Sequence, residues 1–219
     1  MNSQQRHYSP FDLFILQIDN GLRTVFGKPI LTERGNPQDS ISNDNKVELS
    51  NNEKVFSARL MRINHAGEVA AQGLYQGQAL TAKLPKVREK MQRAAEEEND
   101  HLAWCERRIK ELDSHTSYFN PVWYFGSVSI GAIAGLAGDK WSLGFVAETE
   151  RQVVKHLDEH LSSISENDIE SRAVLEQMKI DEGQHATVAV ESGAVELPTP
   201  IKSLMTLTSK VMTKTAYWA

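Results

Sequence analysis

The sequence predicts an all-α protein whose core is a four-helix bundle, and three observations support this fold class. Apolar residues recur at helical spacing along most of residues 51–219, whereas the alternation typical of strands is weak throughout. A pattern of one Glu followed by a Glu-x-x-His occurs twice with similar spacing. A single cysteine excludes an internal disulfide framework, so stability must come from a packed helical core.

Helical stretches are predicted after an N-terminal arm and linker at residues 1–50. They cover residues 52–82, 86–114, 121–162 with a break near Gly138, 167–193 and 200–217. The arm contains a helix with a cap at Ser9, Pro10 in its first turn and an apolar face from Phe11 to Val25. Residues 33–50 are rich in Asn, Asp, Ser and Glu, so we expect a mobile linker before the bundle domain at 51–219.

Composition excludes several classes of function. A chain of 219 residues fits one domain with appendages, and a net charge of −5 argues against a general nucleic-acid binder. The lone Cys105 favours a reducing compartment and is read as a small buried hydrophobic residue. We expect no signal peptide, because no basic stretch with an apolar region and cleavage site begins the chain. We also expect no spanning helix, because no clear charge-free apolar run of about 18 residues occurs.

The repeated pattern is the main functional signal. In each copy a Glu precedes a Glu-x-x-His, by 30 residues in the first copy and 32 in the second. Residues three apart on a helix lie on one face, so each Glu-x-x-His directs both side chains towards one point. All of these residues fall on apolar stripes, where a lone ionised carboxylate is costly. The candidate metal ligands are Glu68, Glu98, His101, Glu150, Glu182 and His185.

Charge balance predicts two metal ions. Four buried glutamates carry four negative charges, which two divalent cations with neutral imidazoles cancel, whereas one cation leaves two charges buried. One Glu from each of two helices, with Glu-x-x-His from each of two others, is the ferritin-like di-iron or di-manganese arrangement. Mixed carboxylate and imidazole ligands suit iron or manganese. Glu97 and Asp181 stand four residues before the two His, and we expect them to hydrogen-bond the imidazole rings.

Other polar residues have two interpretations each. His65, one turn before Glu68, either positions a substrate or satisfies a core hydrogen bond, and the core role is favoured. His156 has the same two interpretations, and its pairing with His160 does not form a zinc protease motif. Tyr75 is either a neighbour of the metal centre or a core residue, and core packing is favoured.

Three segments carry apolar surfaces that suit a membrane interface as well as internal packing. Residues 121–138 are charge-free, aromatic at their start and rich in small residues, and are short for a confident membrane span. Residues 201–218 place apolar side chains beside Lys202, Lys210 and Lys214 and end in Tyr217-Trp218. The apolar face of the N-terminal arm has the same character. We therefore expect a protein that lies on a membrane surface.

Five stretches carry a resemblance to a known family: Arg62–Ala71, Glu98–Leu102, the Gly-rich segment, Glu150–His156 and Asp181–His185. Together they resemble the demethoxyubiquinone hydroxylases of ubiquinone biosynthesis, in their bacterial form. The resemblance covers about residues 55–215, and its Asn-His-Ala-Gly-Glu sequence is far more specific than ligand spacing alone. It implies that the six candidate ligands bind two iron ions and that His156 lies near the quinone site as a catalytic candidate. Animal members have Tyr beside that His, whereas this chain has Leu157.

The resemblance also implies a reaction and a location. The reaction is hydroxylation of a polyprenylated demethoxy-benzoquinol, 2-polyprenyl-3-methyl-6-methoxy-1,4-benzoquinol, with O2, at the cytoplasmic face of the cell inner membrane. No Gly-x-Gly-x-x-Gly fingerprint occurs, so the electron donor or reductase lies outside the chain. A homo-oligomer or a quinone-biosynthesis complex is left open, and no nucleic-acid partner is expected.

Two other classes of protein share the bundle and its ligands. One is another ferritin-like oxidase, a rubrerythrin-like peroxidase or a di-iron hydroxylase of tRNA. The acidic charge weighs against tRNA, and the lack of a Cys-x-x-Cys site weighs against a rubrerythrin. The other is a non-catalytic subunit of a quinone-synthesising complex, in which metal has only a structural role.

Overall fold

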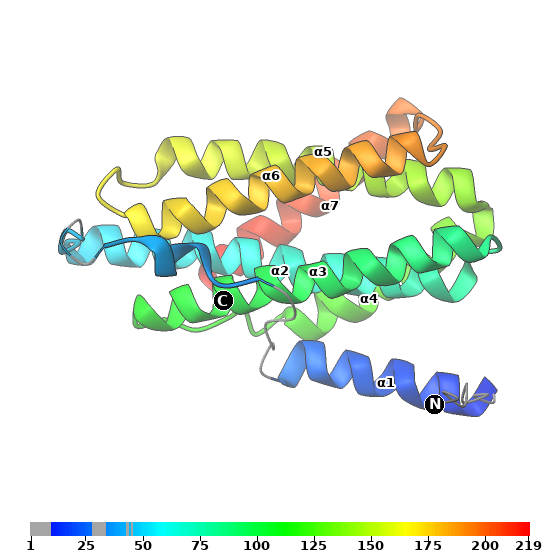
Figure 1. The fold of residues 1–219 in the computed structure, drawn as a ribbon, viewed down its shortest axis with the longest axis horizontal. Helices are drawn as coiled ribbons and strands as arrows, with labels where there is room; N and C mark the ends of the chain where they lie inside the picture. The colour runs from blue at the N-terminus through cyan, green and yellow to red at the C-terminus, as the bar shows by residue number, and fades with distance from the viewer. Residues whose placement is uncertain (1–9, 28–33, 43, 45) are drawn as a thin grey trace, which may run out of the picture.

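The computed structural model describes residues 10–27, 34–42, 44 and 46–219, and these residues form helices and connections without a strand (Figure 1). The predicted all-α fold class is confirmed. The predicted break in the third stretch is confirmed at Gly138, whose φ of 120° suits glycine far better than other residues. Ser9, the predicted cap of the first helix, lies outside the described residues. The elements are α1 (Pro10–Phe26), the 3-10 helix η1 (Pro37–Ser40), α2 (Asn51–Thr81), α3 (Pro85–Glu111), α4 (Asn120–Ala137), α5 (Asp139–Ser163), α6 (Ile169–Glu191) and α7 (Thr199–Trp218).

Local sequence signals explain where the bundle helices begin. Ser50 and Glu53 form a capping box at the start of α2, in which the Ser50 N–H donates to Glu53 Oε2 at 2.9 Å. Asp168 caps α6 by accepting from the Ser171 N–H at 3.1 Å. Helices α3, α4 and α7 carry proline in the first turn, where a missing N–H costs nothing.

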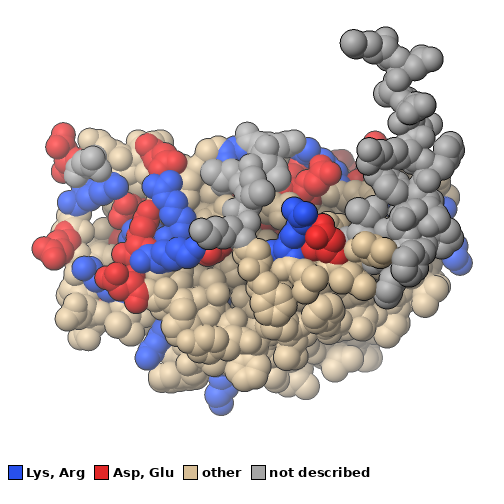
Figure 2. Space-filling model, turned by 90° about the horizontal axis from the view of Figure 1, so that it is seen from below, with Lys and Arg blue, Asp and Glu red and all other residues tan. Residues whose placement is uncertain are grey.

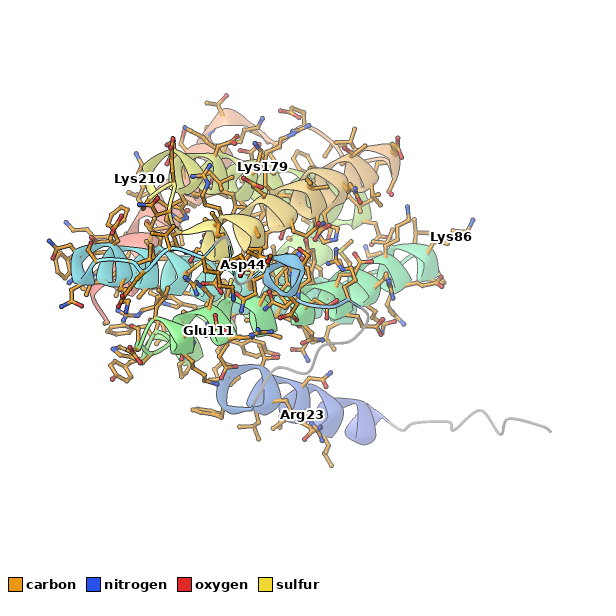
Figure 3. All side chains as sticks on the ribbon, turned by 60° about the vertical axis from the view of Figure 1, so that its left-hand side comes forward. Arg23, Asp44, Lys86, Glu111, Lys179 and Lys210 are labelled. Atoms are coloured by element: carbon orange, nitrogen blue, oxygen red, sulfur yellow. The ribbon has the colours of Figure 1, made fainter. Side chains whose placement is uncertain are left out.

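Two helix pairs form the bundle, with α2 packed on α3 and α5 packed on α6. Side chains fill the space between the ribbons (Figure 3). The apolar core has two parts. One contains Met61, Trp104, Leu157 and Leu175, and the other contains Tyr75, Met91, Leu143 and Val146. On each of the four helices, the candidate ligands lie in sequence between residues of the first core part and residues of the second. Apolar packing therefore encloses the site from both ends.

Helix α4 packs on α2 through a seam of glycines. A Cβ atom added at Gly77 would lie 2.1 Å from the Val128 carbonyl oxygen, and one added at Gly131 would lie 2.2 Å from the Leu74 oxygen. Both distances are far inside van der Waals contact. The two backbones therefore approach closely because neither glycine has a side chain.

The face of α4 that points away from α2 is apolar and exposed, and α1 and α7 also expose large apolar side chains. Figure 2 shows a face of the molecule that is largely free of charge over its lower half. No helix in the described part of the chain is both long enough and apolar enough to cross a bilayer. The exposed apolar residues on these helices include Ile15, Ile18, Leu22 and Phe26 on α1, Val122, Phe125, Ile130, Ile133 and Leu136 on α4, and Ile201, Leu204, Leu207, Val211 and Trp218 on α7.

The segment before α2 lies against the bundle where the structure describes it, although its composition predicts a mobile linker. Gln38 is 2 % exposed and its amide donates to Glu111 Oε1 at 2.8 Å. Asp39 pairs with Arg107 at 2.7 Å, and η1 contacts α6. Polar side chains hold this segment, so a polar composition does not prevent it from docking.

The glycine seam generates a stability prediction. Gly77→Ala should lower the free energy of unfolding by about 2–3 kcal/mol, because the added methyl group overlaps the α4 backbone. Gly126→Ala on α4 is the matched control, since nothing lies within 4 Å of its added Cβ. The control should be neutral or stabilising by about 0.5–1 kcal/mol. Urea unfolding measures both values, and equal stability of the two variants contradicts the close approach.

Candidate metal centre

Four helices bring the six predicted ligands into the bundle interior. Glu68 comes from α2, Glu98 and His101 from α3, Glu150 from α5, and Glu182 and His185 from α6. The four carboxylate residues are at most 3 % exposed. We call these six residues the carboxylate–histidine cluster. Ligand atoms of Glu68, Glu98, His101 and Glu182 all lie within 4.8 Å of one another.

Glu98 and Glu182 lie between the two imidazoles and face both of them. Glu98 directs Oε2 at His101 Nδ1, at 2.9 Å, and Oε1 at His185 Nδ1, at 3.3 Å. Glu182 directs Oε1 at His101 Nδ1 and Oε2 at His185 Nδ1, each at 3.1 Å. The cluster therefore has two imidazole ends joined by two carboxylates.

Each imidazole end has its own further carboxylate. Glu68 Oε2 lies 3.8 Å from His101 Nδ1. At the other end Glu150 accepts a hydrogen bond from the Tyr75 hydroxyl. Its carboxylate also interacts electrostatically with Glu182, Glu98 and His185. Tyr75 therefore combines core burial with a direct contact to a candidate ligand, a role that its apolar position in the sequence did not favour.

The outer nitrogens of both imidazoles are held by carboxylates, as the sequence predicts for Asp181 and Glu97. His101 Nε2 lies 3.0 Å from Asp181 Oδ2, and His185 Nε2 lies 2.7 Å from Glu97 Oε2. The partners are crossed: the α6 carboxylate holds the α3 imidazole, and the α3 carboxylate holds the α6 imidazole. A carboxylate at Nε2 keeps the proton there and leaves Nδ1 as the inward-facing ligand atom.

The electrostatics of the cluster show that its carboxyl groups do not all ionise without added positive charge. Burial raises the pKa of Glu68 well above its usual value, and the charge of Glu98 adds to this effect. Burial, with the charge of Glu182, likewise raises the pKa of Glu150. Burial opposes ionisation of Glu98 too, but His101 and His185 outweigh it and hold that pKa well below its usual value.

The imidazoles carry the compensating protons. Burial acts to lower the pKa of His101, but Glu98 and the hydrogen bonds with Asp181 and Glu182 raise it well above its usual value. Burial also opposes protonation of His185, and hydrogen bonds with Glu182 and Glu98 raise its pKa to about 12. Protons on the two rings therefore occupy positions that cations would take.

The donor set fits two divalent metal ions. Its oxygen and nitrogen ligands suit iron or manganese, and two such ions balance four carboxylates. Glu98 Oε1 and Glu182 Oε1 are buried, and beyond the imidazole nitrogen that each faces they have no well-aligned hydrogen-bond donor among the described residues. Buried carboxylate oxygens without a hydrogen bond are costly, and a metal ion satisfies them.

His156 lies apart from this cluster, further along α5. Its Nε2 is 3.0 Å from the Ser209 hydroxyl of α7, and its Nδ1 is 3.6 Å from Glu159. Its ring also stacks with that of His160, whose Nδ1 lies 2.9 Å from Asn64 Oδ1. His65, for which a core role was favoured, is buried, with Nδ1 3.5 Å from the Asn120 amide.

Comparison with known proteins identifies the family. The family model of "Ubiquinone biosynthesis protein COQ7" matches residues 55–216. The chain belongs to the COQ7 family. It is 61 % identical over 213 residues to a protein of Nitrosococcus oceani, covering 97 % of this chain and 98 % of the relative. A relative in Ectopseudomonas mendocina is 56 % identical over 215 residues, covering 98 % and 99 %. Both relatives carry the name 3-demethoxyubiquinol 3-hydroxylase.

The raised pKa values generate a pH prediction for chelator-treated protein. The folded-state pKa of His185 is raised from 6.5 to about 12, so its stabilising contribution is complete below about pH 6.5 and is lost as the pH rises towards 12. The raised pKa values of Glu68 and Glu150 act in the same direction. The free energy of unfolding should therefore fall above about pH 6.5, by at most about 1.4 kcal/mol per pH unit for each extra proton held.

Urea unfolding between about pH 6.5 and 9.5, in the presence of a chelator, measures this slope. His185→Gln removes one of the protonated groups and should make the slope shallower. Metal-loaded protein should lack the decline, because the cations replace the protons. A free energy of unfolding that rises with pH in the metal-free protein contradicts the prediction.

Proposed function

We propose that the protein is a di-iron monooxygenase that hydroxylates a polyprenylated demethoxy-benzoquinol with O2 in ubiquinone biosynthesis. The observation that carries this proposal is the arrangement of two Glu–His pairs, Glu68 with His101 and Glu150 with His185, joined by Glu98 and Glu182 in a chain of the COQ7 family. The name of the relatives, 3-demethoxyubiquinol 3-hydroxylase, supports the substrate and the position of attack.

The residues divide into ligands and supports. Glu68 with His101 would hold one iron ion, Glu150 with His185 the other, and Glu98 and Glu182 would contact both. When bound, the iron ions would supply the reduction of O2 and the transfer of one oxygen atom to the quinol ring. The protein fixes the imidazole rings through Asp181 and Glu97, orients Glu150 through the Tyr75 hydroxyl, and excludes water with apolar packing.

His156 is proposed to position the quinol. Its imidazole is 31 % exposed at the contact between α5 and α7, so it is open to a ligand in a way that the buried cluster is not. Because it has no contact with the cluster among the described residues, it would act on the substrate and leave the iron ions untouched. His156→Gln should thus keep metal binding and raise KM.

The apolar faces of α1, α4 and α7 support attachment to one face of a membrane. A polyprenyl tail resides in the bilayer, so an enzyme that acts on the ring at the end of this tail must work at the interface. Exposed apolar side chains on three separate helices fit this placement better than they fit a surface bathed only in water.

Genetic complementation tests the reaction and the ligand assignment together. In a host without its own demethoxyubiquinone hydroxylase, the native chain should restore ubiquinone, as measured by mass spectrometry. Glu150→Ala should accumulate the demethoxy precursor, because one iron position loses its carboxylate. Glu148→Ala is the matched control: Glu148 is on the same helix but contacts Gln152 and Lys202, so this variant should restore ubiquinone.

The outcomes also separate the other classes of protein. Rescue by Glu150→Ala would support a non-catalytic subunit of a quinone-synthesising complex. Failure of the native chain, when it is iron-loaded and membrane-bound, would support a different di-iron oxidase.

Liposome flotation tests the membrane surface. Ile133→Ser with Leu136→Ser removes two side chains that are each 67 % exposed on α4, so the fold should persist. The partition coefficient should fall roughly tenfold or more, because about 1 kcal/mol of apolar burial is lost at each site. Ile180→Ser with Val188→Ser on α6 is the matched control, since these side chains are 55 % and 45 % exposed on another helix. Equal flotation of both double variants contradicts docking through α4.

A further inference from the structure

Arg34, in the segment that precedes α2, contacts Asp181, the carboxylate that lies against Nε2 of His101. Its Nη1 donates to Asp181 Oδ2 at 2.7 Å, and the same oxygen lies 3.0 Å from His101 Nε2. Arg34 and the imidazole therefore share one acceptor atom. A chain of three side chains runs from the N-terminal segment to a candidate iron ligand.

Two further contacts fix the guanidinium group of Arg34. Its Nε lies 3.6 Å from Asp100 Oδ2, and its Cζ lies 4.9 Å from the centroid of the Trp104 ring. Trp104 in turn packs on the His101 ring, with the ring centroids 5.2 Å apart. The guanidinium is thus held by two carboxylates and an aromatic face, a combination that suits arginine and not lysine.

The other imidazole, that of His185, has an equivalent set of contacts. At His185 the outer carboxylate is Glu97, and the second oxygen of Glu97 accepts from Arg93 Nε at 2.9 Å. Each imidazole Nε2 therefore contacts a carboxylate, and each of these carboxylates accepts a hydrogen bond from an arginine. Arg93 belongs to α3 and is part of the bundle. Arg34 is supplied by the segment outside it, 147 residues from Asp181 in sequence.

We propose that Arg34 is a positioning residue of the metal centre, which orients His101 for metal binding by holding Asp181. This inference rests on the proposed metal centre and goes beyond it, because it makes the N-terminal segment part of the site. Without Arg34 the Asp181 carboxylate still accepts from His101 and, at Oδ1, from the Gln177 amide at 3.0 Å, but its Oδ2 loses the charged donor that holds it beside the imidazole. The His101 end of the cluster should bind metal more weakly, and the His185 end should not change.

Cobalt binding to chelator-treated full-length protein tests the proposal without relying on turnover. Native protein should take up two equivalents of Co(II), followed by absorption spectroscopy and calorimetry. Arg34→Gln should weaken one equivalent about 3- to 10-fold and leave the other unchanged, somewhat less than the effect of removing a carboxylate that directly holds a ligand imidazole. The cobalt affinity of Arg34→Lys for the weakened equivalent should lie between those of the native protein and Arg34→Gln, because lysine keeps the charge and loses the planar fork.

A double-substitution cycle separates positioning from docking of the segment. In an Asp181→Asn background, Arg34→Gln should change the weakened equivalent less than twofold, because its route to His101 is already broken. Asp39→Asn is the matched control: it breaks the exposed ion pair with Arg107, which ties down the same segment without contacting Asp181, and it should bind cobalt as the native protein does.

Three results would overturn the inference: native affinity in Arg34→Gln, an equal loss in both backgrounds, or an equal loss in Asp39→Asn. Native protein that binds fewer than two equivalents would instead overturn the proposed metal centre itself, and the inference with it.

Discussion

The burial of four carboxylates in one helical core is the constraint on which the rest of the structure depends. Glu68, Glu98, Glu150 and Glu182 are each at most 3 % exposed. Such a group is tolerated only when positive charge, a proton or a metal ion accompanies it. The two imidazoles, the outer carboxylates with their arginines and the hydroxyl of Tyr75 are arranged around this requirement.

The sequence was sufficient to predict the helices and the cluster because both follow from periodic rules. A Glu-x-x-His on an apolar stripe directs both side chains inward, and its repetition predicts that two copies meet. The hydrogen bonds of Asp181 and Glu97 follow from the same spacing, although the crossing between helices does not. Helical periodicity shows which residues face inward but not which helix lies opposite.

Arg34 and Tyr75 show what such rules cannot supply. Arg34 stands in a polar stretch without periodicity, and its partner is 147 residues away, so only the tertiary fold brings them together. Tyr75 occupies an apolar position, where packing is the simpler expectation. Its contact with Glu150 depends on how α2 and α5 pack, which apolar periodicity leaves open. In both cases one specific polar contact, and not a pattern, decides the role.

The protein reverses the usual distribution of polar and apolar groups on part of its structure. A group of titratable side chains is enclosed in the core, whereas α4, whose glycines allow close packing on α2, turns large apolar side chains outward. The proposed substrate has two unlike parts and would explain both features. The enclosed cluster suits oxygen chemistry on the quinol ring, and the exposed apolar face suits a polyprenyl tail that resides in the bilayer. Because α4 packs directly on α2, which carries Glu68, a single helix layer separates the exposed apolar face of α4 from the carboxylate–histidine cluster.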